Sequence, residues 1–500
     1  MHYFLSAPLG YKLTGIEHSI LKRVALYNQA QCPCKIVTLN FSTELNLVLD
    51  KHELAPDNFI NLYQFYQGFT QDRPFTQAQL LVTIPNPTVK HLATTGDFKV
   101  YSNGQYIMYV HCFTGSDRIA YINYFDQVGR KIKRELYDYL GYKSLERTLG
   151  ENQVIISERY FDEKGLVFLE HYPDSDQPFL ILHEQQGRRF FNHMNEWVRY
   201  WLEAQCKNHV RTYLYLDKNR LYAHWVGPMQ APNLFKFAII HSTHVRNPNQ
   251  EYDVTINSNY RYCLTHAQEF DALVVATETQ RQDMLALFEL KTPIYVIPPS
   301  YLRQHRIHPD KRKPNRRPLR ILSTGRYAVE KRLDHMIHAI KMLAFELPDI
   351  TLELYGFGPD KDLNALIVSL GLTEKVTLKG YSAQIKEALY QADLSLVTSK
   401  IESFCIAILD SLEQGTPVIA YDIKYGPAAM IQDGYNGSLV TEASIPELAQ
   451  AIKDFYQHHR LSYTHHTQAI TQDYDHSVVL KKWAELVTTA TLRRTGPEEA

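Results

Sequence analysis

The sequence predicts an α/β protein with two parallel-sheet domains, the first of them interrupted by an antiparallel β-rich insertion. Apolar runs alternate with helix-like segments at the start of the chain and again from residue 212, as buried parallel strands joined by helices require. Between about residues 50 and 190 the apolar period changes to that of strands. A second α/β run begins at residue 318. Two such sheets are expected to face a cleft at the carboxyl ends of their strands, where open α/β folds bind ligands.

The first domain is predicted over residues 1–49 and 191–300. It opens as strand, helix and strand, with a helical stretch from Thr14 to Asn28. The last helix, residues 476–495, is expected to pack back against this domain. The predicted strands of the domain are 3–5, 35–39, 212–216, 237–240, 272–276 and 294–297.

The insertion is predicted over residues 50–190. Two of its segments, 124–129 and 160–165, both read Tyr-Phe-Asp-x-x-Gly, which places Asp and Gly where a hairpin turn needs them. A meander of hairpins is the first interpretation. The tyrosine-rich strands could instead bind an acceptor or another subunit, because exposed aromatic strands often mark contacts. The predicted strands include 98–101, 106–110, 119–122 and 153–156.

A basic segment with several prolines, residues 301–317, is predicted to link the two domains. The second α/β domain follows over residues 318–475, and each of its apolar runs is followed by a helical stretch. Its predicted strands are 319–323, 351–355, 376–378, 394–397 and 417–420.

Composition excludes several classes of protein. Lys and Arg (53) balance Asp and Glu (54), and the formal net charge of −1 lacks the basic excess typical of nucleic-acid binding. No run of about 18 apolar residues predicts a membrane span, and the first residues lack the pattern of a signal peptide. We therefore expect a soluble cytoplasmic protein. The six cysteines are expected to be reduced, because the close pair Cys32 and Cys34 lacks the spacing of a zinc site.

Two cations follow the first strand of the second domain. Arg326, directly after Gly325, and Lys331 stand between the strand end and the next helix. A guanidinium and an ammonium in this position suit a diphosphate, because they can neutralise the charge that builds on a phosphate leaving group. The alternative is a helix start that only water contacts.

Two glycines, Gly356 and Gly358, follow the second strand of this domain and allow a ligand to approach the backbone closely. The alternative is an ordinary tight turn. The dinucleotide fingerprint and the phosphate-loop motif are both absent, which argues against nicotinamide and ATP. Lys379 and Tyr381, after another strand end, could frame a flat base.

The most specific pattern is a strand, a short turn, Glu402 and then an apolar helix with Asp410 eight residues further on. In a regular helix that spacing is about 12 Å along the axis and roughly 80° around it, so one carboxylate can bind a sugar hydroxyl and the other a ribose. Free N–H groups at the helix start form an anion site. Two solvated carboxylates are the alternative. The N–H groups expected to face the anion belong to Ser403, Phe404, Cys405 and Ile406.

In the first domain, His241 and His244 end an apolar strand, and Gly15 opens the first helix. The two histidines lack a third nearby ligand with metal spacing, so we expect hydrogen bonds to a substrate instead of zinc. Asp174 and Asp176 lie between prolines in the insertion, where a turn is the better interpretation than a metal site.

Taken together, these motifs resemble the retaining GT-B glycosyltransferases of family four, whose two Rossmann-like domains face a cleft. Segments 275–283 and 421–427 are similar to those of a narrower group of cell-surface glycosyltransferases in Gram-positive bacteria. That group includes wall teichoic acid α-glycosyltransferases and the O-GlcNAc transferases of serine-rich adhesins, both with a β-rich insertion. Segment 14–17 favours the adhesin enzymes slightly. The motifs that carry the resemblance are Gly15, Gly325-Arg326 with Lys331, Gly356-x-Gly358-Pro359, Glu402 with Asp410, and 415–420.

The resemblance implies a role for each motif residue. Arg326 and Lys331 are expected on the donor diphosphate and Glu402 on the donor sugar. Asp410 is expected on the uridine ribose, although the family usually has the longer Glu there. His244 or His241 is expected near the sugar and phosphate.

The resemblance also implies transfer of GlcNAc or glucose from a UDP-sugar with retention of configuration and without a metal or other cofactor. Ser/Thr hydroxyls of a serine-rich surface protein are the favoured acceptor, and teichoic acid is the alternative. A third hypothesis is a non-catalytic acceptor-binding subunit. The inserted sheet is the expected surface for a homo-oligomer or a sister subunit, and the resemblance allows peripheral association with the inner face of the membrane.

Overall fold

The computed structural model describes the chain except residues 93–94, 251–253, 304, 313–317 and 497–500. Residue 304 and residues 313–317 of the predicted linker therefore lie outside the described residues. The chain divides into two compact units, which are interleaved in sequence. Unit 1 contains residues 1–11, 34–212 and 229–234, and unit 2 contains residues 12–33, 213–228 and 235–500.

Three short parallel strands open unit 1. β1 (His2–Leu5) pairs with β2 (Cys34–Thr38), and β2 pairs with β3 (Phe59–Asn61). Their residues are mostly apolar and buried, as the continuous apolar runs of parallel strands predict. The helices of this unit are α2 (Leu45–Lys51), α3 (Leu62–Gln67), α4 (Gln77–Val82) and α5 (Met194–Lys207).

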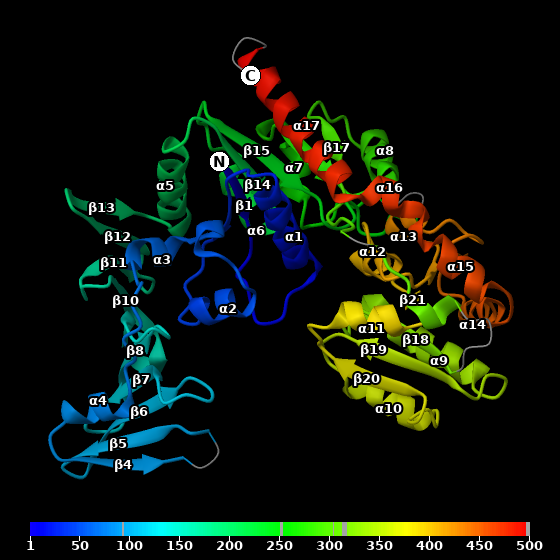
Figure 1. Ribbon diagram of the computed structural model, residues 1–500. Helices are drawn as coiled ribbons and strands as arrows, with labels where there is room; N and C mark the ends of the chain where they lie inside the picture. Colours follow the sequence, from blue (N-terminus) through cyan, green and yellow to red (C-terminus); the bar gives the residue numbers. More distant parts are fainter. Residues whose placement is uncertain (93–94, 251–253, 304, 313–317, 497–500) are drawn as a thin grey trace. The chain divides into compact units, whose positions relative to one another are not determined.

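A ten-stranded antiparallel sheet fills the rest of unit 1 and confirms the predicted β-rich insertion (Figure 1). Each strand pairs with its neighbour in sequence, so the sheet is a meander of hairpins. Its strands are β4 (Pro87–His91), β5 (Phe98–Ser102), β6 (Gln105–Cys112), β7 (Ile119–Phe125), β8 (Lys131–Tyr137), β9 (Lys143–Leu149), β10 (Ile155–Phe161), β11 (Val167–Tyr172), β12 (Phe179–Glu184) and β13 (Gly187–Phe191).

The two echoing segments are hairpin turns, as predicted. Asp126 accepts hydrogen bonds from two backbone N–H groups across the β7–β8 turn, and Asp162 does the same across the β10–β11 turn. Gly129 and Gly165 have φ values of +80° and +76°, in the left-handed region that favours glycine. The local sequence therefore determines both turns.

Unit 2 contains a group of parallel strands with the first and last long helices of the chain. β15 (Leu234–Ile239), β16 (Ala272–Val275) and β17 (Ile294–Val296) are parallel neighbours. The last helix packs close to the first, since Trp483 lies beneath the guanidinium of Arg23 at 4.7 Å from its ring centroid. The remaining elements here are α1 (Gly15–Gln29), β14 (Thr212–Leu216), α6 (Asn219–Val226), α7 (Arg261–Thr265), α8 (Glu278–Leu287) and α17 (His476–Thr495).

The second sheet of unit 2 is fully parallel, with the strand order β20-β19-β18-β21-β22-β23. Successive strands run outward in one direction from β18 and in the other from β21. The carboxyl ends of these two central strands therefore form a topological switch point, the usual place for a ligand. The strands are β18 (Leu319–Thr324), β19 (Ile350–Tyr355), β20 (Val376–Gly380), β21 (Leu394–Val397), β22 (Val418–Tyr421) and β23 (Gly437–Val440).

Helices cover this sheet, and the apolar residues of α9 and α14 form its largest core cluster with β18, β19 and β22 (Figure 1). These parallel sheets and the antiparallel insertion confirm the predicted fold class. The helices are α9 (Leu333–Leu343), α10 (Lys361–Ser369), α11 (Ile385–Gln391), α12 (Ile406–Glu413), α13 (Gly426–Met430), α14 (Ile445–Asp454), α15 (Arg460–His466) and α16 (Thr471–Tyr474).

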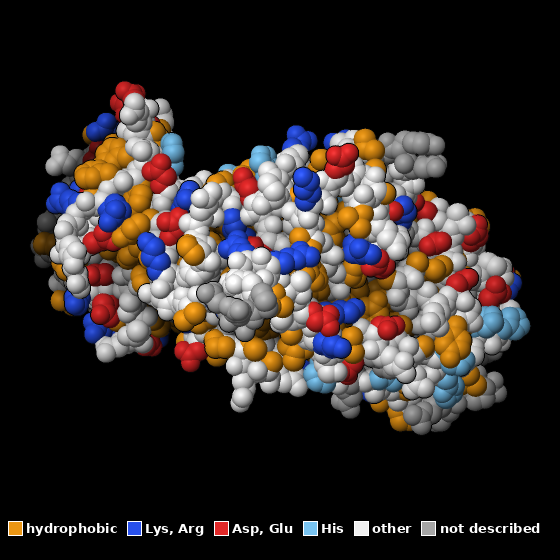
Figure 2. Space-filling view, turned by 90° about the horizontal axis from the view of Figure 1, so that it is seen from above, with side chains coloured by type: hydrophobic (Ala, Val, Ile, Leu, Met, Phe, Trp, Pro, Cys, Tyr) orange, Lys and Arg blue, Asp and Glu red, His pale blue; other side chains and the backbone are white. Residues whose placement is uncertain are grey.

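The surface carries both signs of charge. On the face in Figure 2, Lys and Arg side chains are interspersed with Asp and Glu, in keeping with the formal net charge of −1. Within the described part of the chain, no helix has the length and apolar character that crossing a membrane requires. The six cysteines are free thiols.

Candidate functional site

A cation and a carboxylate meet at the switch point of the second sheet. Lys331 ends the short helix η5 (Val329–Lys331) after β18, and its Nζ lies 2.5 Å from Oε1 of Glu402. Ser399, just past β21, donates to the same oxygen at 2.8 Å. Burial alone would lower the pKa of the Lys331 ammonium, but the charge and hydrogen bond of Glu402 raise it above its ordinary value. The structure thus brings two predicted site residues together as a charged pair.

Arg326 is close enough for its charge to act on Lys331, but it pairs with a different carboxylate. Its guanidinium donates to Glu330 at 2.6 Å, and the two side chains are 50% and 40% exposed. Exposed ion pairs of this kind contribute only about 0 to 1 kcal/mol. The guanidinium is therefore available to a stronger anion at small cost.

The glycines after β18 and β19 are needed for packing between two loops. A Cβ on Gly356 would lie 1.7 Å from the carbonyl oxygen of Gly325, and one on Gly358 would lie 2.5 Å from that of Tyr327. Gly358 also has a φ of +143°. In the structure, neighbouring backbone approaches both glycines closely, and the predicted approach of a ligand to them stays a prediction. Any side chain at Gly356 would separate the loop of Arg326 from the loop after β19.

Lys379 and Tyr381 lie at the end of β20, where we predicted a frame for a base. Lys379 pairs with Glu353 at 3.1 Å. The ring of Tyr381 meets that of Phe357 edge-on, with centroids 5.9 Å apart. The Tyr381 ring therefore lies beside Phe357 of the glycine loop. The Lys379 ammonium instead binds Glu353 on the neighbouring strand β19.

The loop before α12 corrects one prediction. We expected residues 403–406 to start the helix, but α12 begins only at Ile406. Phe404 is 1% exposed and belongs to the core cluster beneath α12. Cys405, the residue before the helix, has a φ of +69°, an unusual conformation for a residue other than glycine. The spacing from Glu402 to Asp410 is therefore only partly helical, and the predicted 12 Å and 80° do not apply.

Burial raises the pKa of the Cys405 thiol well above its ordinary value. The thiol is thus a packed, protonated group beside Lys331 and Glu402. A buried, protonated thiol of this kind is a poor nucleophile.

Asp410 is held by a cation from the first helix. Nζ of Lys22 in α1 lies 2.9 Å from the carboxylate and donates at 2.6 Å to Ser300. Lys22 and Asp410 are each 22% exposed. Sequence reasoning did not find Lys22, because a lysine in an amphipathic helix normally faces water. Gly15, at the start of the same helix, lies close to Ile406: a Cβ on it would be 3.9 Å from the isoleucine Cδ1.

A second buried group of charges surrounds Asp217, which follows β14. Arg23 of α1 donates to both carboxylate oxygens, at 2.9 and 3.1 Å. Nε2 of His241 lies 2.6 Å from the same carboxylate. Burial would raise the pKa of Asp217, but Arg23 and His241 hold it below its ordinary value. Neither Arg23 nor Asp217 was predicted from the sequence.

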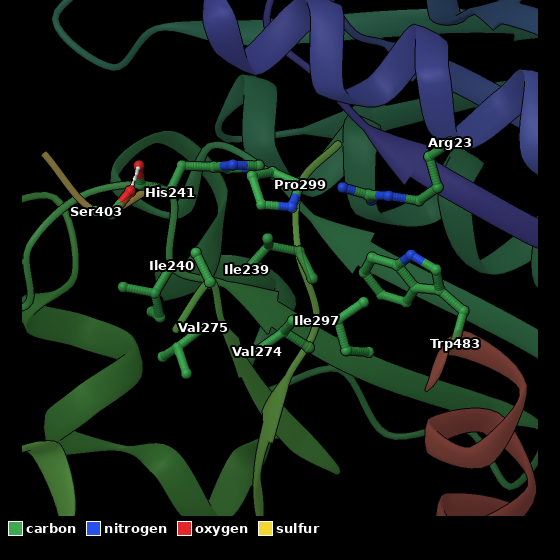
Figure 3. A pocket seen from close by; sticks show the side chains of 11 residues that line it. Arg23, Ile239, Ile240, His241, Val274, Val275, Ile297, Pro299, Ser403 and Trp483 are labelled. Carbon is green, nitrogen blue, oxygen red and sulfur yellow. Dashed lines mark hydrogen bonds between the residues drawn. The ribbon is translucent and has the colours of Figure 1, made fainter. Parts of the chain in front are cut away.

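A small pocket lies beside these residues (Figure 3). In the close-up, the side chains of His241 and Arg23 extend toward one another along one side of the pocket, and apolar side chains line the other. Ser403 joins the pocket to the loop of Glu402, because its Oγ donates to the backbone oxygen of His241 at 2.6 Å. The lining residues are Arg23, Ile239, Ile240, His241, Val274, Val275, Ala276, Ile297, Pro299, Ser403 and Trp483.

His244 occupies a different environment from His241. It is fully buried, and neither ring nitrogen has a hydrogen-bond partner among the described residues. Burial lowers its pKa to about 4, so the ring is neutral at neutral pH. Its ring packs against that of Tyr425 at 5.9 Å. Of the two predicted histidines, His241 lines the pocket in Figure 3 and His244 is not among its lining residues.

Within the described ranges, no three or more His, Cys, Asp or Glu side chains are grouped so that they could hold a metal ion. Asp174 and Asp176 follow β11 in a loop of unit 1. The candidate site is therefore composed of cations, carboxylates and one histidine.

Comparisons with known proteins find similarity to glycosyltransferases. Residues 304–469 match the family model for glycosyl transferases group 1. The match lies in the second half of the chain, over the second parallel sheet of unit 2. The site pair of Lys331 and Glu402 lies inside the matched segment.

Similarity to individual proteins extends over nearly the whole chain. The poly(glycerol-phosphate) alpha-glucosyltransferase of Bacillus subtilis is 23% identical over 97% of this chain and 74% of its own length. The UDP-N-acetylglucosamine--peptide N-acetylglucosaminyltransferase GtfA subunit of Streptococcus parasanguinis is 22% identical over 97% of this chain and 98% of its own length. The solved structure of pneumococcal O-GlcNAc transferase GtfA, in complex with UDP and GlcNAc, has a TM-score of 0.84 at 19% identity, covering 98% of this chain and 99% of that one. The fold and the predicted resemblance to cell-surface glycosyltransferases are confirmed.

Proposed function

We propose that this glycosyltransferase moves GlcNAc or glucose from a UDP-sugar to hydroxyls of a cell-surface acceptor. The observation that carries the proposal is the pair of Lys331 and Glu402 at the switch point of a group 1 glycosyl transferase domain. A cation at this point can stabilise a departing diphosphate, and a carboxylate beside it can accept hydrogen bonds from sugar hydroxyls. The Bacillus glucosyltransferase and the Streptococcus N-acetylglucosaminyltransferase subunit are each similar to 97% of this chain, which supports the same class of reaction.

Each site residue has one role in this proposal. Lys331 and Arg326 bind the diphosphate, and Arg326 leaves Glu330 to do so. Glu402 binds the donor sugar. Asp410 binds the ribose, for which the carboxylate must share or exchange its contact with Lys22. His241 contacts the donor from the pocket side.

We propose that the reaction retains the anomeric configuration and needs no metal ion. The bond between the anomeric carbon and the β-phosphate oxygen breaks, and the acceptor oxygen bonds to that carbon on the same face. The acceptor proton passes to the departing phosphate oxygen, whose charge Lys331 and Arg326 neutralise. Proton NMR of the first-formed product tests retention: an α-linked product from the α-configured donor supports it, and a β-linked product contradicts it.

Calorimetric titration with UDP, UDP-GlcNAc and UDP-glucose in the presence of a chelator tests the donor. We expect binding that survives chelation, prefers one UDP-sugar, and weakens about tenfold or more in Glu402→Ala, because a hydrogen bond to a charged group is lost. Glu346→Ala is the matched control, since that carboxylate is 52% exposed and its ion-pair partner among the described residues is Lys453. No binding to any of the three nucleotides would contradict the proposal and favour a non-catalytic subunit.

The acceptor is proposed to be Ser/Thr hydroxyls of a serine-rich surface protein. Wall teichoic acid is the second candidate, which the similarity to the poly(glycerol-phosphate) enzyme favours. Transfer assays with a serine-rich polypeptide and with a polyol-phosphate polymer decide between them. Faster transfer to the polymer would overturn the first choice.

A sister subunit is also proposed, because the streptococcal relative is named as a subunit. The ten-stranded sheet is the expected contact surface, for a sister subunit or for further copies of this chain. Light scattering of the purified chain tests self-association. If the chain is a monomer, a homo-oligomer is excluded and the sister subunit remains the proposed partner. Location in the cytoplasm and peripheral association with the membrane also remain predictions, and cell fractionation tests both.

A further inference from the structure

Asp217 is completely buried, yet it carries a charge and binds three hydrogen-bond donors. Its side chain is 0% exposed, and its described partners are the two guanidinium N–H groups of Arg23 and Nε2 of His241. An isolated buried carboxylate would be protonated, because burial penalises the charged form. Here the paired guanidinium, itself 3% exposed and seated over Trp483, keeps the carboxylate ionised. The protein thus maintains an anion in direct contact with one histidine.

That anion determines the tautomer of the histidine. A carboxylate only accepts hydrogen bonds, so the hydrogen of the imidazole must be on Nε2, the atom that lies 2.6 Å from Asp217. In the neutral ring Nδ1 is then an acceptor. Among the described residues, none forms a hydrogen bond with Nδ1. The fixed ring therefore presents one unused acceptor.

The position of His241 relates this acceptor to the donor site. The histidine lines the pocket in Figure 3, and its backbone oxygen accepts from Ser403, the residue after Glu402. His241 is thus tied to the loop whose carboxylate pairs with Lys331. His244 is fully buried and stacks on Tyr425, whose backbone N–H donates to the backbone oxygen of Glu402, but neither of its ring nitrogens has a partner among the described residues.

We propose that Asp217 is a positioning residue of the transferase, which acts by holding His241 in the Nε2-protonated tautomer with Nδ1 directed at a hydroxyl of the donor sugar. This inference rests on the proposed function. A hydroxyl fits because it can donate to Nδ1, whereas a phosphate oxygen cannot. Arg23 serves the same end by keeping Asp217 charged. Ring and hydroxyl must be aligned closely, since misplacing a contact by about 1 Å costs about a hundredfold in rate.

A double-mutant cycle tests the inference through kinetics. Asp217→Asn keeps the shape and an acceptor oxygen but removes the charge, and we expect kcat to fall about tenfold to a hundredfold with a smaller change in KM. In a His241→Ala background, the same change should alter kcat less than about twofold, because there is no ring left to position. Equal losses in both backgrounds would show a structural role and overturn the inference.

Asp271→Asn is the matched control for loss of a buried carboxylate. Asp271 pairs with Arg494 in the same unit, and its hydrogen-bond partners among the described residues are Arg494 and the backbone N–H of Lys236. We expect kcat to be unchanged in this variant. A fall equal to that of Asp217→Asn would show that kcat responds to destabilisation alone, which would overturn the inference.

A second measurement does not depend on activity. Nitrogen-15 NMR of histidine-labelled protein reports which ring nitrogen carries the hydrogen, and His241→Gln assigns the signal among the 22 histidines. We expect Nε2-protonated His241 in the wild type, a mixture of tautomers in Asp217→Asn, and a shift of the Nδ1 signal on adding UDP-GlcNAc but not UDP alone. A wild type with Nδ1 protonated, or an unchanged tautomer in the variant, overturns the inference.

The two measurements separate the inference from the proposed function. A wild type that transfers sugar but gives equal losses in the cycle refutes only the role of Asp217. A wild type with the predicted tautomer and the sugar-dependent shift, but without transfer to any acceptor, refutes the transferase reaction and supports the positioning of His241.

Discussion

At the scale of single residues, the candidate site is defined by which charges meet. Sequence reasoning predicted Lys331, Glu402 and Asp410, because cations and carboxylates that follow apolar strands are visible as a pattern. It could not predict Lys22 as the partner of Asp410, since the two are 388 positions apart and only folding brings them together. Asp217 escaped notice for the same reason: its importance lies in contacts with residues on two other elements.

Lys331→Ala tests the cation of the central pair. We expect kcat to fall about a hundredfold to a thousandfold, because one charge that stabilises the departing diphosphate is removed from a partly buried site. Kinetic assays with the preferred UDP-sugar measure the effect. Lys453→Ala, which removes a surface cation of the same domain, is the control and should leave kcat unchanged. Normal turnover in Lys331→Ala would contradict the assignment.

At the scale of elements, the boundaries of strands β19 and β21 were predicted more accurately than the start of helix α12. The predicted strand 394–397 coincides with β21, and 351–355 differs from β19 by one residue. Buried parallel strands leave a continuous apolar signal, which needs no tertiary information. The start of α12 was wrong by three residues, because Phe404 packs into the core and Cys405 takes a positive φ, and both depend on tertiary packing.

The turn between β8 and β9 gives a prediction about packing. Gly141 has a φ of +96°, and a Cβ there would lie 1.8 Å from the carbonyl oxygen of Arg73. Gly141→Ala therefore combines a strained φ with a backbone clash, and we expect it to lower the free energy of unfolding by about 2 to 4 kcal/mol. Gly129→Ala has a similar φ of +80° and open space, so only about 1 kcal/mol should be lost. Urea unfolding of both variants measures the difference, and equal losses would contradict the clash.

The same turn gives a prediction about pH. Burial raises the pKa of Asp138 from its ordinary 3.8 to about 6, although the N–H of Leu140 donates to the carboxylate. The folded state therefore binds this proton more tightly than the unfolded state, and the contribution of Asp138 to stability falls as pH rises from about 4 to about 6. Asp138→Asn keeps the hydrogen bond without the charge. We expect this variant to gain about 2 to 3 kcal/mol relative to the wild type between pH 4 and pH 7. Urea unfolding at both pH values measures the gain, and a constant difference would contradict it.

At the scale of the whole molecule, charge distribution bears on the choice of acceptor. A polyol-phosphate polymer carries a regular row of negative charges, and proteins that bind polyanions gather cations whose contribution weakens with salt. This chain has a formal net charge of −1, and the face in Figure 2 mixes both signs. A serine-rich polypeptide acceptor needs no such field.

We therefore expect transfer to a serine-rich polypeptide to change less than about twofold when salt is raised from about 50 to about 500 mM. Initial rates at subsaturating acceptor measure this, because they report acceptor binding as well as chemistry. Saturating acceptor provides the control, since salt effects that persist there belong to the donor or to turnover. A steep fall with salt at low acceptor only would mean that electrostatic attraction brings the acceptor to the enzyme. In that case the phosphate polymer, and not the serine-rich protein, would be the acceptor that the surface selects.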